Sequence, residues 1–307
     1  MGTKSLVFGS FVVDLMARTP HLPVPGETVK GSGFQMGPGG KGFNQAVAAH
    51  KAGADVALAI KLGKDTFAEI AQNMMNELGM SRDYVFRSST HSTGCALIMV
   101  GEDSSQNEIV VVPGASLSFA DEDVDLIKQA IDECGYLLMQ LEINMDAMIL
   151  AAEYAVKHGK KVILNPAPAA DIPEKLWPML DMVIPNEVEA EYYTGIAIRT
   201  EEEAKKAADW FHAKGVKQVV ITLAERGAYL SGEGHGCLVP AFPVKAVDTT
   251  GAGDAFCGGL LAALSEGKGL WEAVCFANAA AALSVQKIGT APSMPVREEI
   301  LELAAYC

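Results

Sequence analysis

The chain reads Val247-Asp248-Thr249-Thr250-Gly251-Ala252-Gly253-Asp254-Ala255-Phe256 before it enters an alanine- and leucine-rich helical pattern that ends at Ser265. The small residues permit a tight turn, and a helix that begins there would leave backbone N–H groups unpaired. The helix dipole favours an anion at such a place, for example a phosphoryl group in transfer. A carboxylate at Asp254 would repel a bound phosphate, so we interpret it as a general base for a hydroxyl group that attacks phosphorus. The simpler alternative is that Asp248 or Asp254 only caps the helix.

Along the rest of the chain, short β-branched runs bounded by Gly or Pro alternate with longer alanine-rich helical patterns. This alternation is typical of a parallel sheet covered by helices. The expected strands are Ser5–Gly9, Val56–Ile60, Tyr136–Gln140, Lys161–Leu164, Met182–Ile184 and Val219–Leu223. The expected helices are Phe43–Ala52, Phe67–Leu78, Ala120–Ile131, Met145–His158, Glu187–Thr194, Thr200–Ala213, Ala252–Ser265, Leu270–Val285 and Val296–Ala304.

Three strand-like runs interrupt the alternation without helices between them: Val29–Gln35, Gly94–Gly101 and Asn107–Val112. Hairpin material of this kind does not join a parallel sheet easily, so we expect a small side sheet that serves as a lid. Such a sheet would expose one apolar face, which a ligand or a second subunit could cover. The lid and a dimer contact could therefore be the same element.

Composition restricts the partners. The 307 residues are 50% hydrophobic and 20% charged, as in ordinary globular proteins, and one catalytic unit is the simplest reading. Lys and Arg total 24 against 38 Asp and Glu, which gives a formal charge of -14. A surface this acidic repels nucleic acid and anionic lipid alike, so we expect neither as a partner. A phosphorylated small molecule is compatible if a metal and local N–H groups or cations offset the repulsion.

The six cysteines form no C-x-x-C pair and have no nearby histidine at metal-ligand spacing, so the sequence predicts neither a disulfide framework nor a zinc site. Buried thiols in a reducing cytosol are the simplest interpretation. The N-terminal apolar run ends at Gly9 and is too short for a signal peptide, and no apolar stretch approaches the length of a membrane helix. We expect a cytoplasmic protein.

A second glycine-rich segment runs from Gln35 to Gln45 and contains G-x-G-x-x-G at Gly37, Gly39 and Gly42. A dinucleotide fold must be weighed, but the segment follows lid-like strands and not the first core strand. It also lacks the spacing of a phosphate-binding P-loop. We therefore expect a glycine-rich turn that brings the backbone, Lys41 and Asn44 close to a polyhydroxylated ligand. The alternative is that these glycines only mark a loop between two elements and have no role in ligand binding.

Several acidic residues follow expected strands. Asn186 is a good N-cap with Glu189 three positions later, so a capping box alone explains this pair. The alternative is that the carboxylates at this helix start hold the waters of a hydrated Mg²⁺. Asp14 and Glu142 follow apolar strands, and ligands gather at the carboxyl ends of strands in open α/β sheets.

Taken together, the motifs identify a resemblance: the whole chain resembles the ribokinase family of PfkB-type carbohydrate kinases. Two segments are specific signatures of that family, Gly39–Ala49 and Asp248–Phe256. Weaker matches lie at Leu138–Glu142, Leu164–Pro168, Pro185–Glu189, Ile221–Leu223 and Gly289–Ser293. The resemblance implies a three-layer α/β fold with a mostly parallel central sheet and a β lid. Residues 1–307 would form one kinase domain, with the lid made from about 11–36 and 92–113.

The resemblance also implies ATP-dependent phosphorylation of the primary 5-hydroxyl of a pentose, foremost D-ribose, and a homodimer joined through the lid. Asp254 would be the base, beside an anion hole formed by Gly251, Ala252 and Gly253. The implied sugar ligands are Asp14, Gly40, Lys41, Asn44, Glu142 and Asp254. The implied nucleotide contacts are Asn186, Thr222, Ala224, Gly227, Gly251, Gly253 and Asn278. Asn186 and Glu189 would organise Mg²⁺ through water, and Asp248, Thr250 and Ser293 would bind K⁺.

Three positions depart from the family pattern. Ribokinases carry asparagine where this chain has Val12, and valine can neither donate to nor accept from a sugar hydroxyl. Because an unpaired buried hydroxyl costs roughly 1–3 kcal/mol, 2-deoxyribose becomes a competing substrate. Phe43 replaces the usual alanine and could narrow the sugar pocket, and Ala224 replaces a usual glycine and crowds the nucleotide.

Two functions of other classes remain open at this point. A NAD-dependent oxidoreductase would use Gly37, Gly39 and Gly42 but leaves the Asp254 segment unexplained. A sugar-binding regulator without catalysis would not need a base at Asp254. Another sugar or nucleoside kinase of the PfkB type is the nearer alternative.

Overall fold

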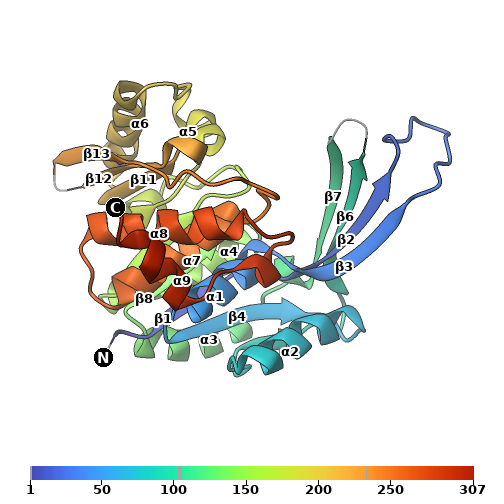
Figure 1. The fold of residues 1–307 in the computed structure, drawn as a ribbon. Coiled ribbons are helices and arrows are strands. Elements are labelled where there is room, and N and C mark those ends of the chain that lie inside the picture. Colours follow the sequence, from blue (N-terminus) through green and yellow to red (C-terminus); the bar gives the residue numbers. More distant parts are fainter. Residues whose placement is uncertain (1, 103–105, 233) are drawn as a thin grey trace.

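Two sheets of different size organise the part of the chain that the computed structural model describes, residues 2–102, 106–232 and 234–307 (Figure 1). The large sheet has nine strands in the order β13-β12-β11-β10-β9-β8-β1-β4-β5. Its strands are β1 Ser5–Phe8, β4 Val56–Leu62, β5 Val85–Arg87, β8 Tyr136–Gln140, β9 Lys161–Asn165, β10 Met182–Val183, β11 Gln218–Thr222, β12 Ala228–Gly232 and β13 His235–Val239.

All neighbours from β11 to β5 pair in parallel, whereas β12 pairs antiparallel with β11 and with β13. β1 and β4 are buried along their whole length, as expected for central strands covered on both faces. From β1 the chain first builds one edge through β4 and β5, and later builds the other from β8 onward. The order of the strands therefore reverses between β1 and β8.

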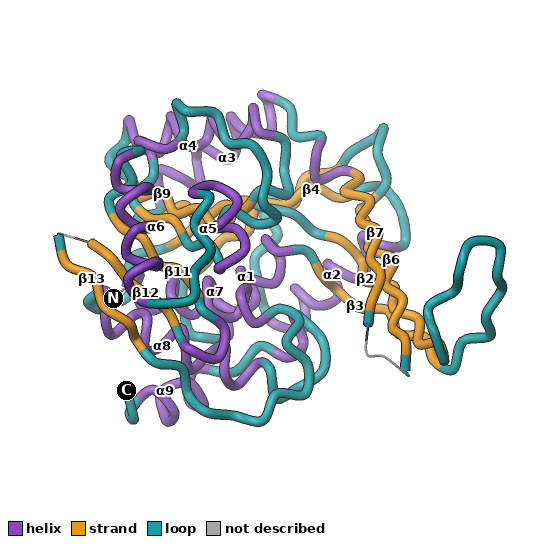
Figure 2. The backbone as a smooth tube through the Cα atoms, turned by 90° about the horizontal axis from the view of Figure 1, so that it is seen from above, coloured by secondary structure: helices purple, strands orange, loops and turns teal. Residues whose placement is uncertain are grey.

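Helices cover both faces of the large sheet, as Figure 2 shows from above. The apolar core of one face joins the sheet to α1 Lys41–Lys51, α2 Phe67–Leu78, α7 Ala252–Ser265, α8 Leu270–Ser284 and α9 Arg297–Ala304. The core of the other face joins it to α3 Asp121–Glu133, α4 Met145–Lys157, α5 Glu187–Thr194 and α6 Glu201–Ala213. The expected three-layer α/β architecture is confirmed.

Helices α1 and α7 pack unusually closely. A Cβ atom on Gly258 would lie 2.4 Å from the Cβ of Ala48 and 2.6 Å from the carbonyl oxygen of Gln45. Only a residue without a side chain permits this approach. The contact brings the first turn of α1, with Asn44 and Gln45, next to the first turn of α7.

The small sheet extends away from the helices and has the order β3-β2-β6-β7 (Figure 1). Its strands are β2 Val12–Thr19, β3 Gly33–Gly39, β6 Thr93–Gly101 and β7 Asn107–Gly114. β2 pairs in parallel with β6, and the other two pairs are antiparallel. Several of its apolar side chains are about half exposed or more: Phe34, Met36, Leu97, Ile109, Val110, Val111 and Val112. The expected lid-like side sheet is confirmed as a separate element.

The details of some strands differ from the expectations. The expected glycine-rich turn within Gln35–Gln45 takes up less of the segment than predicted, because residues up to Gly39 continue β3 and pair along β2, with Asp14 opposite Gly37. The turn comes one residue later, at Gly40, whose φ is 91°. The run expected from Val29 becomes a strand only at Gly33. β5 and the β12–β13 hairpin were not predicted, since β5 is three residues long and glycines interrupt the hairpin.

One cysteine pairing departs from the sequence interpretation. Cys275 and Cys307 form a disulfide with their Cα atoms 5.9 Å apart, although they are 32 positions apart in the chain. The pairing arises because α9 packs back on α8, which the spacing of the cysteines does not reveal. In the described ranges, none of the helices combines the length and the apolar character needed to cross a membrane.

Candidate functional site

Several of the predicted site residues lie near the carboxyl ends of β1 and β8, where the strand order reverses. This is the position at which open α/β sheets bind their ligands. Ser10 lies just after β1 and Glu142 just after β8, and the Ser10 hydroxyl donates a hydrogen bond to the Glu142 carboxylate. Glycines let the backbone segments meet here, since a Cβ on Gly42 would lie 2.6 Å from the Cα of Gly9.

The first turn of α7 places Asp254 at the centre of this region. Gly251 caps the helix with a φ of 80°, a conformation that favours glycine. A Cβ on Gly253 would meet nothing within 4 Å, so this face of the turn is open. Within the described residues, no hydrogen bond occupies the N–H groups of Gly253 and Asp254, as expected for the start of a helix. Open N–H groups therefore lie beside the carboxylate at Gly253 and Asp254. The predicted role of Ala252 is wrong, because its N–H donates to the Thr249 carbonyl at 3.2 Å.

Two amides hold the Asp254 carboxylate, which is 6% exposed. The Nδ2 of Asn44 donates to Oδ2 at 2.9 Å, and the Nε2 of Gln45 donates to Oδ1 at 2.9 Å. Both donors come from α1, across the close contact at Gly258. Asp254 is thus oriented by side chains, which a role as a simple helix cap would not require.

Two cavities meet at this turn. A cavity of about 170 Å³ is lined by Lys41, Asn165, Ala167, Ile184, Asn186, Glu189, Thr222, Thr249, Gly251, Ala252, Gly253, Asp254 and Cys257. A larger one of about 770 Å³ lies between the small sheet and the loops near residues 248 and 290, and Asp14, Arg18, Asp248 and Thr250 are among its lining residues. Thr249 lines both cavities, so they adjoin at this residue, and Asp254 lines the smaller one.

Lys41 supplies a positive charge in the cavity that contains Asp254. It opens α1 after Gly40, and its backbone N–H donates to the Glu142 carboxylate at 3.0 Å. Burial alone would lower the pKa of its ammonium group, but the carboxylates of Asp254, Glu142 and Glu189 outweigh burial and raise this pKa. Lys41 therefore stays charged beside Asp254 at neutral pH.

Asn186 and Glu189 form a capping box at the start of α5. The Asn186 Oδ1 accepts from the Glu189 N–H at 2.8 Å, and the Glu189 Oε2 accepts from the Asn186 N–H at 2.9 Å. Glu189 is 8% exposed, and burial raises its pKa. The structural interpretation of this pair is confirmed, but both residues also line the cavity that contains Asp254.

The residues predicted to contact the nucleotide are spread along one path. Thr222 ends β11 and forms a parallel bridge with Asn186. The next turn contains Ala224, with a φ of 49° in the left-handed region, and Gly227, with a φ of 102°. Asn278 lies in α8, where its Nδ2 donates to the carbonyls of Val239 and Pro240. Ala224, Gly227 and Asn278 do not line the two cavities.

The predicted potassium ligands lie in two loops that approach each other. The Asp248 carboxylate accepts from the N–H groups of Thr250 and Gly289, both at 3.0 Å. Burial would raise the pKa of Asp248, but these hydrogen bonds outweigh burial and lower it. Ser293 is 1% exposed and donates its hydroxyl to the carbonyl of Thr290 at 2.7 Å. The Asp248 carboxylate is thus held in its charged form.

Comparison with protein-family models finds a match over residues 2–297 to the pfkB family carbohydrate kinases. The chain belongs to this family. It is 42% identical over 300 residues to a ribokinase of Haemophilus influenzae, covering 98% of each chain. It is 36% identical to a deoxyribokinase of Salmonella typhi, covering 96% of this chain and 97% of the relative. A solved structure of Arabidopsis thaliana ribokinase, complexed with ribose and ATP, is 32% identical with a TM-score of 0.92 and covers 100% of both chains.

Membership of the pfkB family decides between the functions that the sequence left open. The chain is a carbohydrate kinase, so the oxidoreductase reading of Gly37, Gly39 and Gly42 is excluded, as is the regulator without catalysis. The small-molecule partner is a sugar.

Sequence reasoning missed part of this kinase site. Gln45, Gln140 and Asn165 are buried amides connected to Asp254, and none of them was assigned a role. Gln140 and Asn165 end β8 and β9, in otherwise apolar strands. The one sequence feature that could have indicated a role for Gln140 and Asn165 is that each is a single amide at the carboxyl end of an apolar strand.

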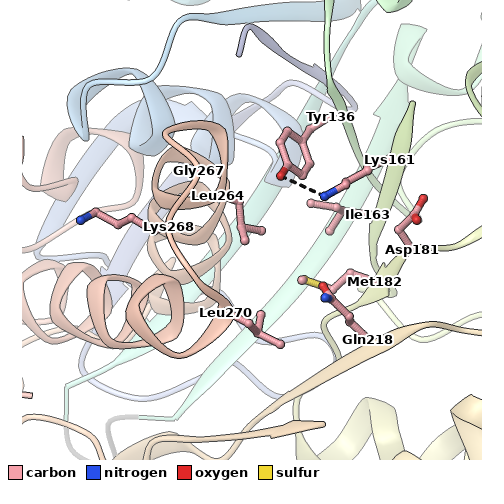
Figure 3. Close-up of a pocket in the computed structure, with 10 residues that line it drawn as sticks. All are labelled: Tyr136, Lys161, Ile163, Asp181, Met182, Gln218, Leu264, Gly267, Lys268 and Leu270. Atoms are coloured by element: carbon pink, nitrogen blue, oxygen red, sulfur yellow. Dashed lines mark hydrogen bonds between the residues drawn. The ribbon is translucent and has the colours of Figure 1, made fainter. Parts of the chain in front are cut away.

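The pocket of about 210 Å³ in Figure 3 lies elsewhere. Its lining includes the first residues of four neighbouring strands, Tyr136, Lys161, Met182 and Gln218. It therefore lies at the amino ends of the strands, opposite the kinase site. The Lys161 Nζ reaches the Tyr136 hydroxyl only at 3.5 Å. None of the predicted site residues lines this pocket.

Asp14 gives the kinase site a testable pH dependence. Burial and the nearby Glu142 carboxylate raise its pKa to about 6, against the lowering effect of a hydrogen bond with Thr290. A protonated carboxyl loses acceptor capacity for sugar hydroxyls. We therefore expect the KM for the sugar to rise as the pH falls below about 6, by up to about tenfold per unit. Steady-state kinetics between pH 5 and 8 measure this, and Asp14→Asn should remove the dependence. A KM that stays flat in the wild type across this range would contradict the assignment.

Proposed function

We propose that the chain transfers the γ-phosphoryl group of ATP to the primary 5-hydroxyl of D-ribose. One observation carries the proposal: the oriented carboxylate of Asp254 lies beside the open N–H groups at the start of α7, where two cavities adjoin. Such a site offers a base on one side and an anion-binding helix start on the other. The ribokinases among its relatives support ribose as the acceptor and ATP as the donor.

In the proposed reaction, Asp254 accepts the proton of the 5-hydroxyl while that oxygen attacks the γ-phosphorus. The new O–P bond forms as the bond between the γ-phosphorus and the bridging oxygen breaks, and ADP leaves. The N–H groups of Gly251, Gly253 and Asp254 stabilise the charge on the phosphoryl oxygens, and the Lys41 ammonium adds to this. The N–H of Ala252 is used by the Thr249 carbonyl and does not take part. Positioning and charge stabilisation then supply most of the rate.

The sugar would lie between the lid and the start of α1. Asn44 supports this placement although it lines neither cavity, because it is 4% exposed beside Lys41 and Asp254 and its Oδ1 has no hydrogen-bond partner within the described residues. A sugar hydroxyl would satisfy that oxygen. Asp14 and Glu142 offer carboxylate acceptors, and the turn at Gly40 and Lys41 brings backbone close to the ligand. The nucleotide would extend from the smaller cavity past Thr222, Ala224 and Gly227 towards Asn278.

The residues present fit the two expected metal ions. For Mg²⁺, Glu189 offers a buried carboxylate in the cavity of Asp254, with Asn186 beside it, and no group of three or more candidate metal ligands occurs in the described ranges. A Mg²⁺ held largely through water suits such a sparse ligand set and would neutralise phosphate charge. For K⁺, the charged Asp248 with Thr250 and Ser293 supplies oxygen ligands in adjoining loops.

A screen of ADP release across pentoses, deoxypentoses, hexoses and nucleosides tests the proposed function. We expect the largest kcat/KM with ribose, and turnover should require Mg²⁺ and rise with K⁺. Absence of ADP release with every pentose would contradict the proposal. A nucleoside or hexose that exceeds ribose would keep the kinase and replace the acceptor.

Val12 favours a second candidate acceptor, 2-deoxyribose. Val12 starts β2 beside the turn at Gly40, where a Cβ on the glycine would lie 2.8 Å from the Val12 nitrogen. A deoxyribokinase is also among the relatives. We expect Val12→Asn to raise the preference for ribose over 2-deoxyribose by about 10-fold, the value of one hydrogen bond to a sugar hydroxyl. The ratio of kcat/KM for the two sugars measures this. Unchanged selectivity in the variant would remove Val12 as its cause.

We further propose that residues 1–307 act as one kinase domain with a lid of about 11–36 and 92–113, and that the lid joins two copies in a homodimer. The half-exposed apolar side chains of β3, β6 and β7 support this, since a sheet face of this kind is usually covered. Sedimentation velocity of the wild type and of Val110→Lys tests the dimer. A cytoplasmic location stays a prediction from the sequence.

A further inference from the structure

Three buried amide side chains, Gln45, Gln140 and Asn165, are connected to Asp254 by hydrogen bonds. The Gln140 Nε2 donates to the Gln45 Oε1 at 2.6 Å. The Gln45 Nε2 in turn donates to the Asp254 Oδ1 at 2.9 Å and to the Asn165 Oδ1 at 3.0 Å. The Asn165 Nδ2 donates to the carbonyl of Ile184 at 2.8 Å. Gln45 and Gln140 are fully buried, and Asn165 is 8% exposed.

These contacts leave Gln45 one orientation. Both hydrogens of its amide are used by acceptors, and its carbonyl oxygen is used by a donor. Rotating the amide by half a turn would place its oxygen against both the Asp254 carboxylate and the Oδ1 of Asn165, whose own Nδ2 is held by the Ile184 carbonyl. Each of these contacts would be repulsive in a site of low polarity. Gln45 is therefore locked as a donor to Asp254.

The backbone next to Gln140 leaves room for this row of hydrogen-bonded amides. A Cβ on Gly9 would lie only 2.1 Å from the Gln140 Oε1, so the residue after β1 must be glycine for Gln140 to adopt its position. The fold alone does not explain the amides, because apolar side chains of similar shape would fill the same space at little or no cost in stability. The Gln140 amide donates to Gln45 and Gln45 donates to Asp254, whereas Asn165 donates away from Asp254, to the carbonyl of Ile184. The orientation of the two glutamines towards the carboxylate indicates a role in catalysis.

We propose that Gln45, supported by Gln140, is a positioning residue that fixes the rotation of the Asp254 carboxylate about its side chain. Asn44 holds one carboxylate oxygen and Gln45 the other, so the plane of the carboxylate is set by donors from two consecutive residues of α1. Gln45 itself does not line either cavity and would not touch the sugar or the nucleotide. This inference rests on the proposed function, in which Asp254 is the base.

Gln45→Met tests the proposal because it keeps the length and volume of the side chain but removes both donors. We expect kcat to fall about 10- to 100-fold, the usual effect of a small misplacement of a catalytic group. The KM for ribose should change by less than about threefold, because Gln45 makes no contact with the sugar. Gln140→Met, which does not touch Asp254, should lower kcat in the same sense but less, by about 3- to 10-fold. Steady-state kinetics with ribose and ATP measure these values.

A double-mutant cycle separates positioning from a purely structural role. If Gln45 acts through Asp254, Gln45→Met should have no more than about a twofold effect on kcat in an Asp254→Asn background. A purely structural loss would lower kcat by the same factor in both backgrounds. His212→Leu is the matched control, since it removes two hydrogen bonds of a half-buried side chain, to Val216 and Ser231, at the opposite edge of the sheet. It should lower Tm without changing kcat.

Four outcomes are decisive. A folded Gln45→Met with kcat within twofold of the wild type overturns the positioning role alone, as does the same factor in both backgrounds. If Gln45→Met does not fold, Gln140→Met in the same cycle decides in its place. A wild type that releases no ADP with any sugar overturns the proposed function, and the positioning role with it.

Discussion

Replacing Asp254 by asparagine is expected to lower kcat about 10²- to 10⁴-fold, the usual contribution of a general base. The amide keeps the shape of the carboxylate but cannot accept the proton of the attacking hydroxyl. Sugar binding should change little, because the other proposed sugar contacts remain in place. The measurement is ADP release at saturating ribose and ATP, with ribose affinity determined separately by calorimetry.

Stability provides the control for this variant. Asp254 is buried and accepts hydrogen bonds from Asn44 and Gln45, so an asparagine there must place its own NH₂ group against at least one amide donor. We therefore expect a lower Tm together with the loss of kcat, and circular dichroism should still report a folded protein. Near-normal turnover by a folded Asp254→Asn enzyme would remove the base assignment.

Gly258→Ala is expected to lower the free energy of unfolding by about 1–3 kcal/mol, the usual cost of overpacking a core. Alanine in a helix would by itself gain about 1 kcal/mol over glycine. Overpacking should outweigh this gain, because the new methyl group would lie 2.6 Å from the carbonyl oxygen of Gln45 and 2.7 Å from the nitrogen of Ala49. These are backbone atoms, so α1 and α7 must separate. Urea denaturation measures the loss.

The same variant should also lose activity, although residue 258 lines neither cavity and lies one helical turn beyond Asp254. The hydrogen bonds from Asn44 and Gln45 to Asp254 cross the interface that the methyl group would widen. We expect kcat to fall at least about tenfold at a temperature where the variant is folded. Gly269→Ala is the matched control, since a Cβ there would approach nothing closer than 3.9 Å. A Gly258→Ala enzyme with both stability and kcat of the wild type would contradict the packing argument.

The layered fold could be predicted because its signal is periodic. Buried parallel strands such as Val56–Leu62 are continuous apolar runs, and helices such as Phe67–Leu78 repeat their apolar residues with helical spacing. The β12–β13 hairpin carries less of this signal, because Gly232, His235 and Gly236 interrupt its apolar residues. The sequence predicted a turn within Gln35–Gln45 but did not show that Gly39 belongs to a strand. Gly39 has no side chain because a Cβ there would lie 2.4 Å from the Asp14 carboxylate of the paired strand. Pairing across strands cannot be read from one segment alone.

The site could be predicted where residues cluster in the chain, as they do around Asp254 and around Lys41. The structure brings those two segments together, and Glu189 and Glu142 with them. It could not be predicted that Gln45 and Gln140 belong to the same site. Gln140 is a single amide in an apolar strand, and Gln45 follows Asn44 in a helix whose buried face the sequence does not reveal. The role of each depends on a partner about a hundred or more positions away.

The distance along the chain between Asn44 and Asp254, 210 positions, has a consequence for biosynthesis. While the ribosome is still translating the segment before α7, α1 and β8 already exist, but their amides have no carboxylate to hold. The face of the sheet that α7 later covers is also still open to water or to chaperones. A nascent chain at that stage lacks the proposed base and cannot hydrolyse or transfer phosphate from ATP, so turnover would begin only after α7, in roughly the last fifth of the polypeptide, has docked.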